Sequence, residues 1–238
     1  MSSRKGRKDA ARVVREQLAR ERRRKRTLWI SLGAVVVLVI AGLIGWAAWS
    51  SQTPDDYTAP PGANEAGTGI VVGSGPVTID VYEDYLCPAC KQFEQTSGAT
   101  LEQLVSDGKV RVVYHPVAYL NRYSSTQYST RSSAAAGCAA EGGRFTEFSK
   151  ALFERQPAEG GAGLSNDELI EIGAGLGLDR DAFGSCVRDG KYRSWTAHVS
   201  DEANRAKITG TPSILVDGKP VRDWSPENIT AAVEAAGK

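Results

Sequence analysis

The chain has 238 residues, of which 41% are hydrophobic and 24% charged, the proportions of an ordinary globular protein rather than of a disordered or fibrous chain. The formal net charge of +1 is unevenly distributed, because residues 1–26 hold 12 Lys and Arg against 3 Asp and Glu, leaving 17 basic and 25 acidic residues for the rest. A basic tail of this kind can bind nucleic acid, but the apolar segment after it favours a different role.

Residues 28–49 form an apolar stretch of 22 residues without a charge. As a helix it would be roughly 33 Å long, enough to cross a hydrocarbon core of about 30 Å. The basic residues should remain on the cytoplasmic side, which makes residues 1–27 a cytoplasmic tail and places the rest of the chain outside. A cleaved signal peptide is the alternative, but the long basic leader and long apolar core favour an uncleaved, single-pass anchor in the cell membrane.

Residues 50–69 are rich in Pro, Gly, Ala and polar side chains and have little to bury. This composition predicts a flexible linker between the anchor and a folded domain. The domain should extend over residues 70–238, which is long enough for one sizeable core.

The first half of this domain predicts a β-α-β unit. Residues 70–72 are expected to form a short edge strand, and residues 77–82 are β-branched and aromatic, as in a longer strand. Helical character follows Cys87, and residues 110–114 read as the next strand. We therefore expect a parallel pair of strands joined by a right-handed crossover.

From about residue 124 to residue 206 the apolar spacing is helical, which predicts an α-helical insertion. Residues 213–216 resume strand character and are followed by a tight turn at Asp217-Gly218. Ser225 and Pro226 then predict the start of a last helix. The fold class expected is α/β, with two parts of one sheet separated by the helical block.

The four cysteines lie at positions 87, 90, 138 and 186. A structural zinc site normally uses two close pairs of ligands, and only one such pair exists here, so no metal is expected. Outside the membrane an even number of cysteines indicates disulfides. The residues allow three pairings and do not choose among them, although the helical block holding both distant cysteines favours pairing Cys138 with Cys186. Two buried free thiols at these positions are the alternative.

Cys87 and Cys90 have a setting typical of a redox pair. A strand precedes them, Pro88 suits the first turn of a helix, and Cys90 falls inside that turn. Cys87 is therefore expected at a helix N-terminus, where free N–H groups stabilise the thiolate that attacks disulfides. A permanent structural disulfide with the same spacing is the alternative.

Three features together resemble the DsbA-like thiol:disulfide oxidoreductases of the membrane-anchored bacterial type: the stretch EDYLCPAC at residues 83–90, the helical block, and Gly210-Thr211-Pro212-Ser213. The resemblance covers about residues 70–238. It implies a thioredoxin-like fold with an inserted α-helical domain, preceded here by one N-terminal transmembrane helix. It also implies that Pro212 is cis and that Thr211 and Pro212 form the substrate-binding loop facing the cysteine pair.

The resemblance further implies a structural disulfide between Cys138 and Cys186, and Cys87 and Cys90 as the catalytic pair. The substrates would be reduced secreted proteins, and a membrane reoxidase of the DsbB or VKOR-like type would regenerate the enzyme. No organic cofactor and no metal is required, no nucleic acid is involved, and a monomer is expected.

The chain departs from the strongest family oxidant between the cysteines, where Pro88-Ala89 replaces Pro-His. We expect the pKa of Cys87 to lie below the free value of about 8.5, but less far below than with histidine present. Glu83 and Asp84 are candidate modulators that oppose the thiolate or relay protons, with an ordinary surface role as the alternative.

We expect an oxidase that introduces disulfides into secreted and membrane proteins. A reductase or isomerase of extracytoplasmic disulfides is the first alternative. A non-catalytic binding module with a thioredoxin fold is the second, although such a module has no need of both sulfurs.

Overall fold

The computed structural model describes residues 37–42, which are helical, and residues 57–237. Within these ranges no helix has the length and apolar character needed to cross a membrane. The expected cytoplasmic tail lies outside the described residues, as does the expected anchor apart from residues 37–42. The chain divides into two units, residues 1–54 and residues 55–238, and the second unit holds all four cysteines.

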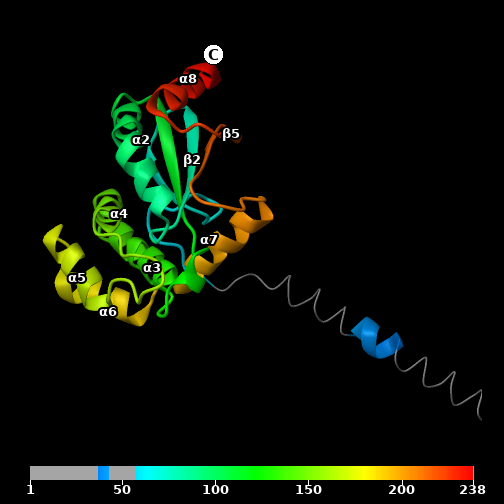
Figure 1. The fold of residues 1–238 in the computed structure, drawn as a ribbon, viewed down its shortest axis with the longest axis vertical. Helices are drawn as coiled ribbons and strands as arrows, with labels where there is room; N and C mark the ends of the chain where they lie inside the picture. Colours follow the sequence, from blue (N-terminus) through cyan, green and yellow to red (C-terminus); the bar gives the residue numbers. More distant parts are fainter. Residues whose placement is uncertain (1–36, 43–56, 238) are drawn as a thin grey trace, which may run out of the picture. The chain divides into compact units, whose positions relative to one another are not determined.

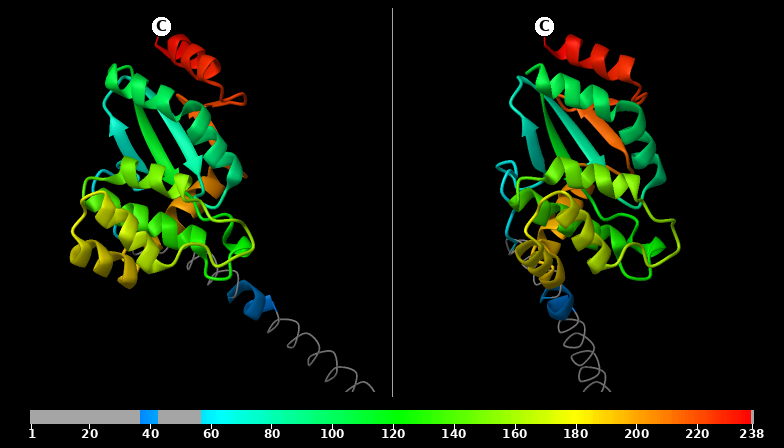
Figure 2. Two further views of the ribbon diagram at one scale, coloured as in Figure 1. Left: turned by 60° about the vertical axis from the view of Figure 1, so that its left-hand side comes forward. Right: turned by 90° about the vertical axis from the view of Figure 1, so that its left-hand side faces the viewer.

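The second unit is built on a five-stranded mixed sheet (Figures 1 and 2). Its spatial order is β1-β3-β2-β4-β5, where the strands are β1 (Ile70–Gly73), β2 (Val77–Glu83), β3 (Val110–Pro116), β4 (Ser213–Val216) and β5 (Lys219–Val221). β2 and β3 are parallel and the other pairs are antiparallel. The predicted parallel pair is confirmed, with helix α2 (Pro88–Ser106) as its crossover.

The alternation of side chains along β2 decides which face of the sheet is buried. Val77, Ile79 and Val81 are almost completely buried, whereas the residues between them are only partly so. Helix α2 packs against β1 and β3 of this sheet, and α8 (Pro226–Ala236) packs against β4, β5 and α2. Glu83 continues the same buried row at the end of β2, so the strand carries a carboxyl group into the core directly before the cysteine pair.

A helical insertion separates β3 from β4, as predicted. It contains a short 3₁₀ turn (Asn121–Tyr123) and the helices α3 (Tyr128–Glu141), α4 (Phe145–Glu154), α5 (Asn166–Gly175), α6 (Arg180–Asp189) and α7 (Arg193–Arg205). These helices gather at one end of the sheet, whereas α8 lies at the opposite end (Figures 1 and 2). Cys138 of α3 and Cys186 of α6 form a disulfide.

Residues 57–69, which the sequence assigned to a flexible linker, instead pack against the domain. Three successive carbonyls of this segment each face a ring nitrogen from elsewhere in the fold. Trp195 Nε1 donates to Gly67 O at 2.7 Å, His115 Nδ1 lies 2.6 Å from Thr68 O, and His198 Nε2 lies 3.3 Å from Ala66 O. The linker prediction is therefore wrong for residues 57–69, because backbone carbonyls of the segment are hydrogen-bonded to the domain and Tyr57, Ala59 and Ala63 pack against its core.

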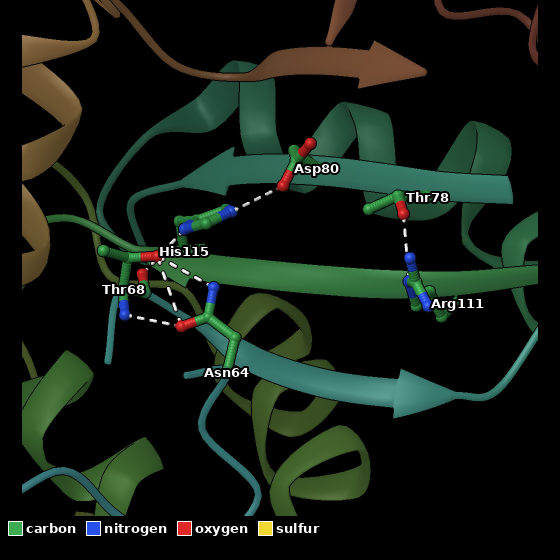
Figure 3. A network of polar contacts seen from close by, with 6 residues as sticks. All are labelled: Asn64, Thr68, Thr78, Asp80, Arg111 and His115. Atoms are coloured by element: carbon green, nitrogen blue, oxygen red, sulfur yellow. Dashed lines mark hydrogen bonds and ion pairs between the residues drawn. The ribbon is translucent and has the colours of Figure 1, made fainter. Parts of the chain in front are cut away.

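His115 connects this segment to the centre of the sheet (Figure 3). Its Nε2 lies 3.0 Å from Asp80 Oδ1 on β2, and its ring stacks on Tyr82 with 4.1 Å between the centroids. Asn64 closes the turn by accepting a hydrogen bond from Thr68 N at 2.8 Å. Both nitrogens of the buried ring are thus engaged in holding the fold, which gives this histidine a structural role.

Candidate active site

Cys87 and Cys90 lie at the point where β2 passes into α2. Cys87 is the N-cap residue of α2, Pro88 occupies the first turn, and Cys90 N donates to Cys87 O at 3.1 Å. Both thiols are free in this structure. Proline fits here because its missing N–H is one that the first turn of a helix leaves unpaired in any case.

The turn before Cys87 is shaped by Asp84. Its Oδ1 accepts a hydrogen bond from Leu86 N and its backbone carbonyl one from Cys87 N, both at 2.9 Å. Its second carboxylate oxygen accepts from Leu120 N, also at 2.9 Å. Asp84 is completely buried, so this carboxylate holds the active-site turn and ties it to the loop that follows β3.

Thr211 and Pro212 face the cysteine pair from the loop between α7 and β4. The peptide bond between them is cis, and the Cys87 sulfur lies 3.3 Å from Thr211 O. The structure therefore brings together the two sequence motifs, Cys-Pro-Ala-Cys and Thr-Pro, that lie far apart in the chain.

The two sulfurs differ strongly in acidity. A hydrogen bond from the Cys90 side chain is the largest cause that lowers the pKa of Cys87 to about 5; the Thr211 side chain and the backbone of Cys90 and Ala89 add to it, against the opposing effect of burial. Burial, followed by the hydrogen bond and charge of Cys87, raises the pKa of Cys90 well above that of a free thiol. Near neutral pH the reduced pair thus holds one thiolate, on Cys87.

Glu83 and Asp84 are both buried, which excludes the ordinary surface role considered for them. Burial raises the pKa of Glu83 to about 8, with the nearby charge of Glu94 adding to the effect and a hydrogen bond from Ser149 opposing it. The Ser149 hydroxyl lies 3.2 Å from Glu83 Oε1. Burial likewise raises the pKa of Asp84 to about 6, against the hydrogen bonds from Leu86 and Leu120. Glu83 is thus neutral at pH 7 and can hold or release a proton behind the pair.

A cavity of about 520 Å³ opens beside Cys87. Its walls come from the loop after β3, the loop before β4, the α4–α5 connection and the end of α7. The lining includes Cys87, Tyr119, Leu120, Arg122, Tyr123, Glu159, Asn204 and Thr211. Cys87 is 7% exposed, whereas Cys90 is 1% exposed and does not line the cavity. A chain entering from solvent therefore meets Cys87 first.

The remaining predictions from the sequence concern Ala89 and a metal site. Ala89 contributes its backbone N–H to the Cys87 sulfur rather than a side-chain group. Within residues 37–42 and 57–237, no group of three or more His, Cys, Asp or Glu side chains is arranged to hold a metal ion.

Sequence reasoning missed Ser149 and Gln156, which both reach the site from the helical insertion. Ser149 meets Glu83, and Gln156 donates to two backbone carbonyls next to the pair. Neither residue stands in a motif, and each lies more than 60 positions from its partner, so nothing in the local sequence pointed to them.

A thioredoxin-like sheet, a Cys-x-x-Cys pair at a helix start and a cis-proline loop facing it define the class of thiol:disulfide oxidoreductase folds. A family model described as thioredoxin matches residues 65–235. The chain therefore belongs to this thioredoxin family, and it resembles the DsbA-like members of it.

Solved structures from Mycobacterium tuberculosis support this assignment. Its DsbA in the reduced form is 32% identical, with a TM-score of 0.63, over 72% of this chain and 93% of that one. Its disulfide bond oxidoreductase DsbG is 33% identical, with a TM-score of 0.64, over 73% of this chain and 89% of that one.

A curated relative shows the same domain in a longer protein. The serine/threonine-protein kinase PknE of M. tuberculosis is 31% identical over 169 residues, which cover 66% of this chain and 30% of the kinase. The chain thus spans less than a third of that relative, and the similarity concerns a single domain.

Proposed function

We propose that the protein is an extracytoplasmic thiol:disulfide oxidoreductase that introduces disulfides into secreted and membrane proteins. The observation that carries this proposal is the placement of Cys87 as the N-cap residue of α2, beside Cys90 and Thr211, with a pKa lowered below that of a free thiol while that of Cys90 is raised. A stabilised thiolate favours the reduced form of the pair, and a pair whose reduced form is favoured is a strong oxidant.

The reaction begins with the oxidised pair. A substrate thiolate attacks the Cys87 sulfur, the Cys87–Cys90 bond breaks, and Cys90 leaves and takes up a proton. A second substrate thiolate then attacks the substrate sulfur of the mixed disulfide, and Cys87 leaves as a thiolate. Two electrons pass from the substrate dithiol to the cysteine pair, and the low pKa of Cys87 speeds the second step because it makes Cys87 a good leaving group.

Residues around the pair assist these steps. Thr211, whose carbonyl lies 3.3 Å from the Cys87 sulfur, and Pro212 present backbone to the incoming chain. The cavity beside Cys87 receives residues next to the substrate cysteine. Glu83 is a candidate donor of the proton that Cys90 takes up, because its pKa of about 8 leaves it protonated at neutral pH.

The location and partners belong to the same proposal. The apolar stretch at residues 28–49 and the basic tail before it support a single-pass anchor with the domain outside the cytoplasm. A membrane reoxidase of the DsbB or VKOR-like type would accept the two electrons, as the family resemblance implies. Labelling intact cells with a membrane-impermeant thiol reagent, after a membrane-impermeant reductant has opened the Cys87–Cys90 disulfide, tests the orientation, because only an external domain would be reduced and modified.

Oxidative refolding tests the activity. The oxidised full-length protein is mixed with a reduced, unfolded protein that needs disulfides for its own activity, and recovery of that activity is followed. We expect stoichiometric recovery with the wild type and none with Cys87→Ser. Reduction of a disulfide substrate without any oxidation would favour the reductase alternative, and the absence of both reactions would favour the binding module.

A further inference from the structure

The connection between α4 and α5 passes beside the active-site turn, and one side chain of it reaches the backbone there. Gln156 Nε2 donates to Tyr85 O at 3.1 Å and to Cys87 O at 2.9 Å. A primary amide carries two N–H donors on one nitrogen. Gln156 donates both of these N–H groups to the carbonyls of the residues on either side of Leu86.

These carbonyls belong to the part of the backbone that decides where the Cys87 sulfur points. Cys87 O also accepts from Cys90 N at 3.1 Å and from Lys91 N at 3.3 Å, the bonds that start α2. Holding the Cys87 carbonyl therefore fixes the angle between the N-cap residue and the first turn. On the other side of the turn, Asp84 Oδ1 holds Leu86 N at 2.9 Å. The active-site turn is thus held by hydrogen bonds on two sides, from the buried Asp84 and from Gln156 of the insertion.

The position of Gln156 is fixed by contacts at the end of α4. Its backbone N–H donates to Phe153 O at 3.3 Å, and the Phe153 ring packs against the Tyr85 ring with 5.1 Å between centroids. Lys91 Nζ on α2 donates to Glu154 O at 3.4 Å. The end of α4 therefore contacts the active-site segment at three places, of which Gln156 is the one that reaches Cys87.

We propose that Gln156 is a positioning residue for the cysteine pair: it holds the backbone of residues 85–87 so that the first-turn N–H groups of α2 face the Cys87 sulfur. The backbone of Ala89 and Cys90 supplies such hydrogen bonds, and they require the helix start to keep its orientation. The helical insertion thereby acts on the backbone of the redox pair through the Gln156 amide. This inference deepens the proposed function and rests on it for its biological meaning.

The test compares variants of Gln156 in the full-length protein. Gln156→Met keeps the length of the side chain and removes both donors, Gln156→Glu replaces them with a carboxylate, and Gln156→Lys keeps a donor. The readouts are the thiolate absorbance of Cys87 against pH in a Cys90→Ser background and the reduction potential of the intact pair.

We expect the pKa of Cys87 to rise by about one unit in Gln156→Met, which makes the pair about tenfold, or about 30 mV, less oxidising. Gln156→Glu should raise the pKa further, and Gln156→Lys should leave it at or below the wild-type value. The matched controls are Gln95→Met and Gln95→Glu, because Gln95 is exposed on α2, and they should titrate as the wild type does.

A folded Gln156→Met variant with a wild-type titration curve and potential would overturn the proposal. If that variant does not fold, Gln156→Ala decides, because it removes both donors without adding a charge, and a wild-type titration curve in it would contradict the role given to the hydrogen bonds. A reduction potential of the wild-type protein in the thioredoxin range would contradict the proposed oxidase function. The comparison between the Gln156 and Gln95 variants would still test the positioning role of Gln156.

Discussion

The Cys87 sulfur lies 3.3 Å from the carbonyl oxygen of Thr211, although the two residues are 124 positions apart. This contact joins the start of α2 to the loop before β4 and places Cys87 at the mouth of a cavity formed by the loops on either side. Cys90 lies deeper. The fold therefore exposes the Cys87 sulfur to a substrate chain and buries the Cys90 sulfur, which forms and breaks the bond within the pair.

The acidity of the two thiols can be measured separately. In Cys90→Ser, which retains a hydroxyl beside Cys87, we expect thiolate absorbance to appear with an apparent pKa near 5. In Cys87→Ser, the remaining Cys90 should stay protonated beyond the pH at which a free thiol ionises, because its pKa is raised by burial. A Cys87 pKa at or above about 8.5 would contradict the stabilised thiolate.

The hydroxyl of Thr211 contributes to that stabilisation. Thr211→Val keeps the shape of the side chain and removes the hydrogen bond to the Cys87 sulfur. We expect the pKa of Cys87 to rise by roughly 1–2 units, since a hydrogen bond to a charged group is lost. Thr209→Val, at an exposed position of the same loop, is the control. Equal titration of both variants would assign the effect to the loop rather than to the hydroxyl.

Glu83 should give the domain a pH-dependent stability. Its folded pKa is raised from 4.5 to about 8, so the folded state binds the proton more tightly and stability falls as pH rises from about 4.5 to 8. Glu83→Gln removes this loss, and the slope of unfolding free energy against pH should differ from wild type by up to about 1.4 kcal/mol per pH unit.

The measurement uses denaturant unfolding of the oxidised protein between pH 6 and 8, because neither Cys87 nor Cys90 titrates there and the Asp84 pKa of about 6 lies at the edge of the window. Glu159→Gln, which changes the same charge at an exposed position, should keep the wild-type slope. Parallel curves for all three proteins would mean that Glu83 is not a neutral buried acid.

The disulfide between Cys138 and Cys186 closes a long loop within the helical insertion. Replacing both cysteines with alanine should lower the unfolding free energy by about 2–5 kcal/mol, as the loss of a native disulfide commonly does. The reduction potential of the Cys87–Cys90 pair should not change. A shifted potential in the folded double variant would show that this second disulfide takes part in the redox chemistry.

His115 should matter for stability and not for the redox chemistry. In His115→Leu, Thr68 O and the Asp80 carboxylate lose their ring partners. The Asp80 side chain is 24% exposed and can bond to water instead, so the expected loss is about 1–3 kcal/mol, the cost of one unsatisfied polar group. Urea unfolding should show the loss, and His198→Leu should show less, because His198 is only half-buried. An unchanged midpoint for His115→Leu would contradict the fastening of residues 57–69.

Local signals predicted the parts of the fold that local chemistry controls. The β-α-β unit, the start of α2 at Cys87-Pro88, the turn at Asp217-Gly218 and the extent of the helical insertion all follow from patterns a few residues long. The prediction that Thr211 and Pro212 face Cys87 came from the resemblance to a family, because no local pattern specifies which distant segments come into contact.

The remaining features depend on partners that a sequence does not reveal. Residues 57–69 have a linker-like composition, and their order comes from Trp195, His115 and His198, which lie far along the chain. Glu83 and Asp84 are buried among partners far along the chain, which include Ser149 for Glu83 and Leu120 for Asp84. Gln156 follows the same rule, since its acceptors lie 69 and 71 positions away.

The reduction potential of the Cys87–Cys90 pair, measured by equilibration of the full-length protein with glutathione at pH 7, tests the central claim most directly. A thiolate stabilised as strongly as that of Cys87 predicts a potential between about −120 and −200 mV, in the range of disulfide-forming proteins. A value near −270 mV, in the thioredoxin range, would contradict the oxidase and support a reductase.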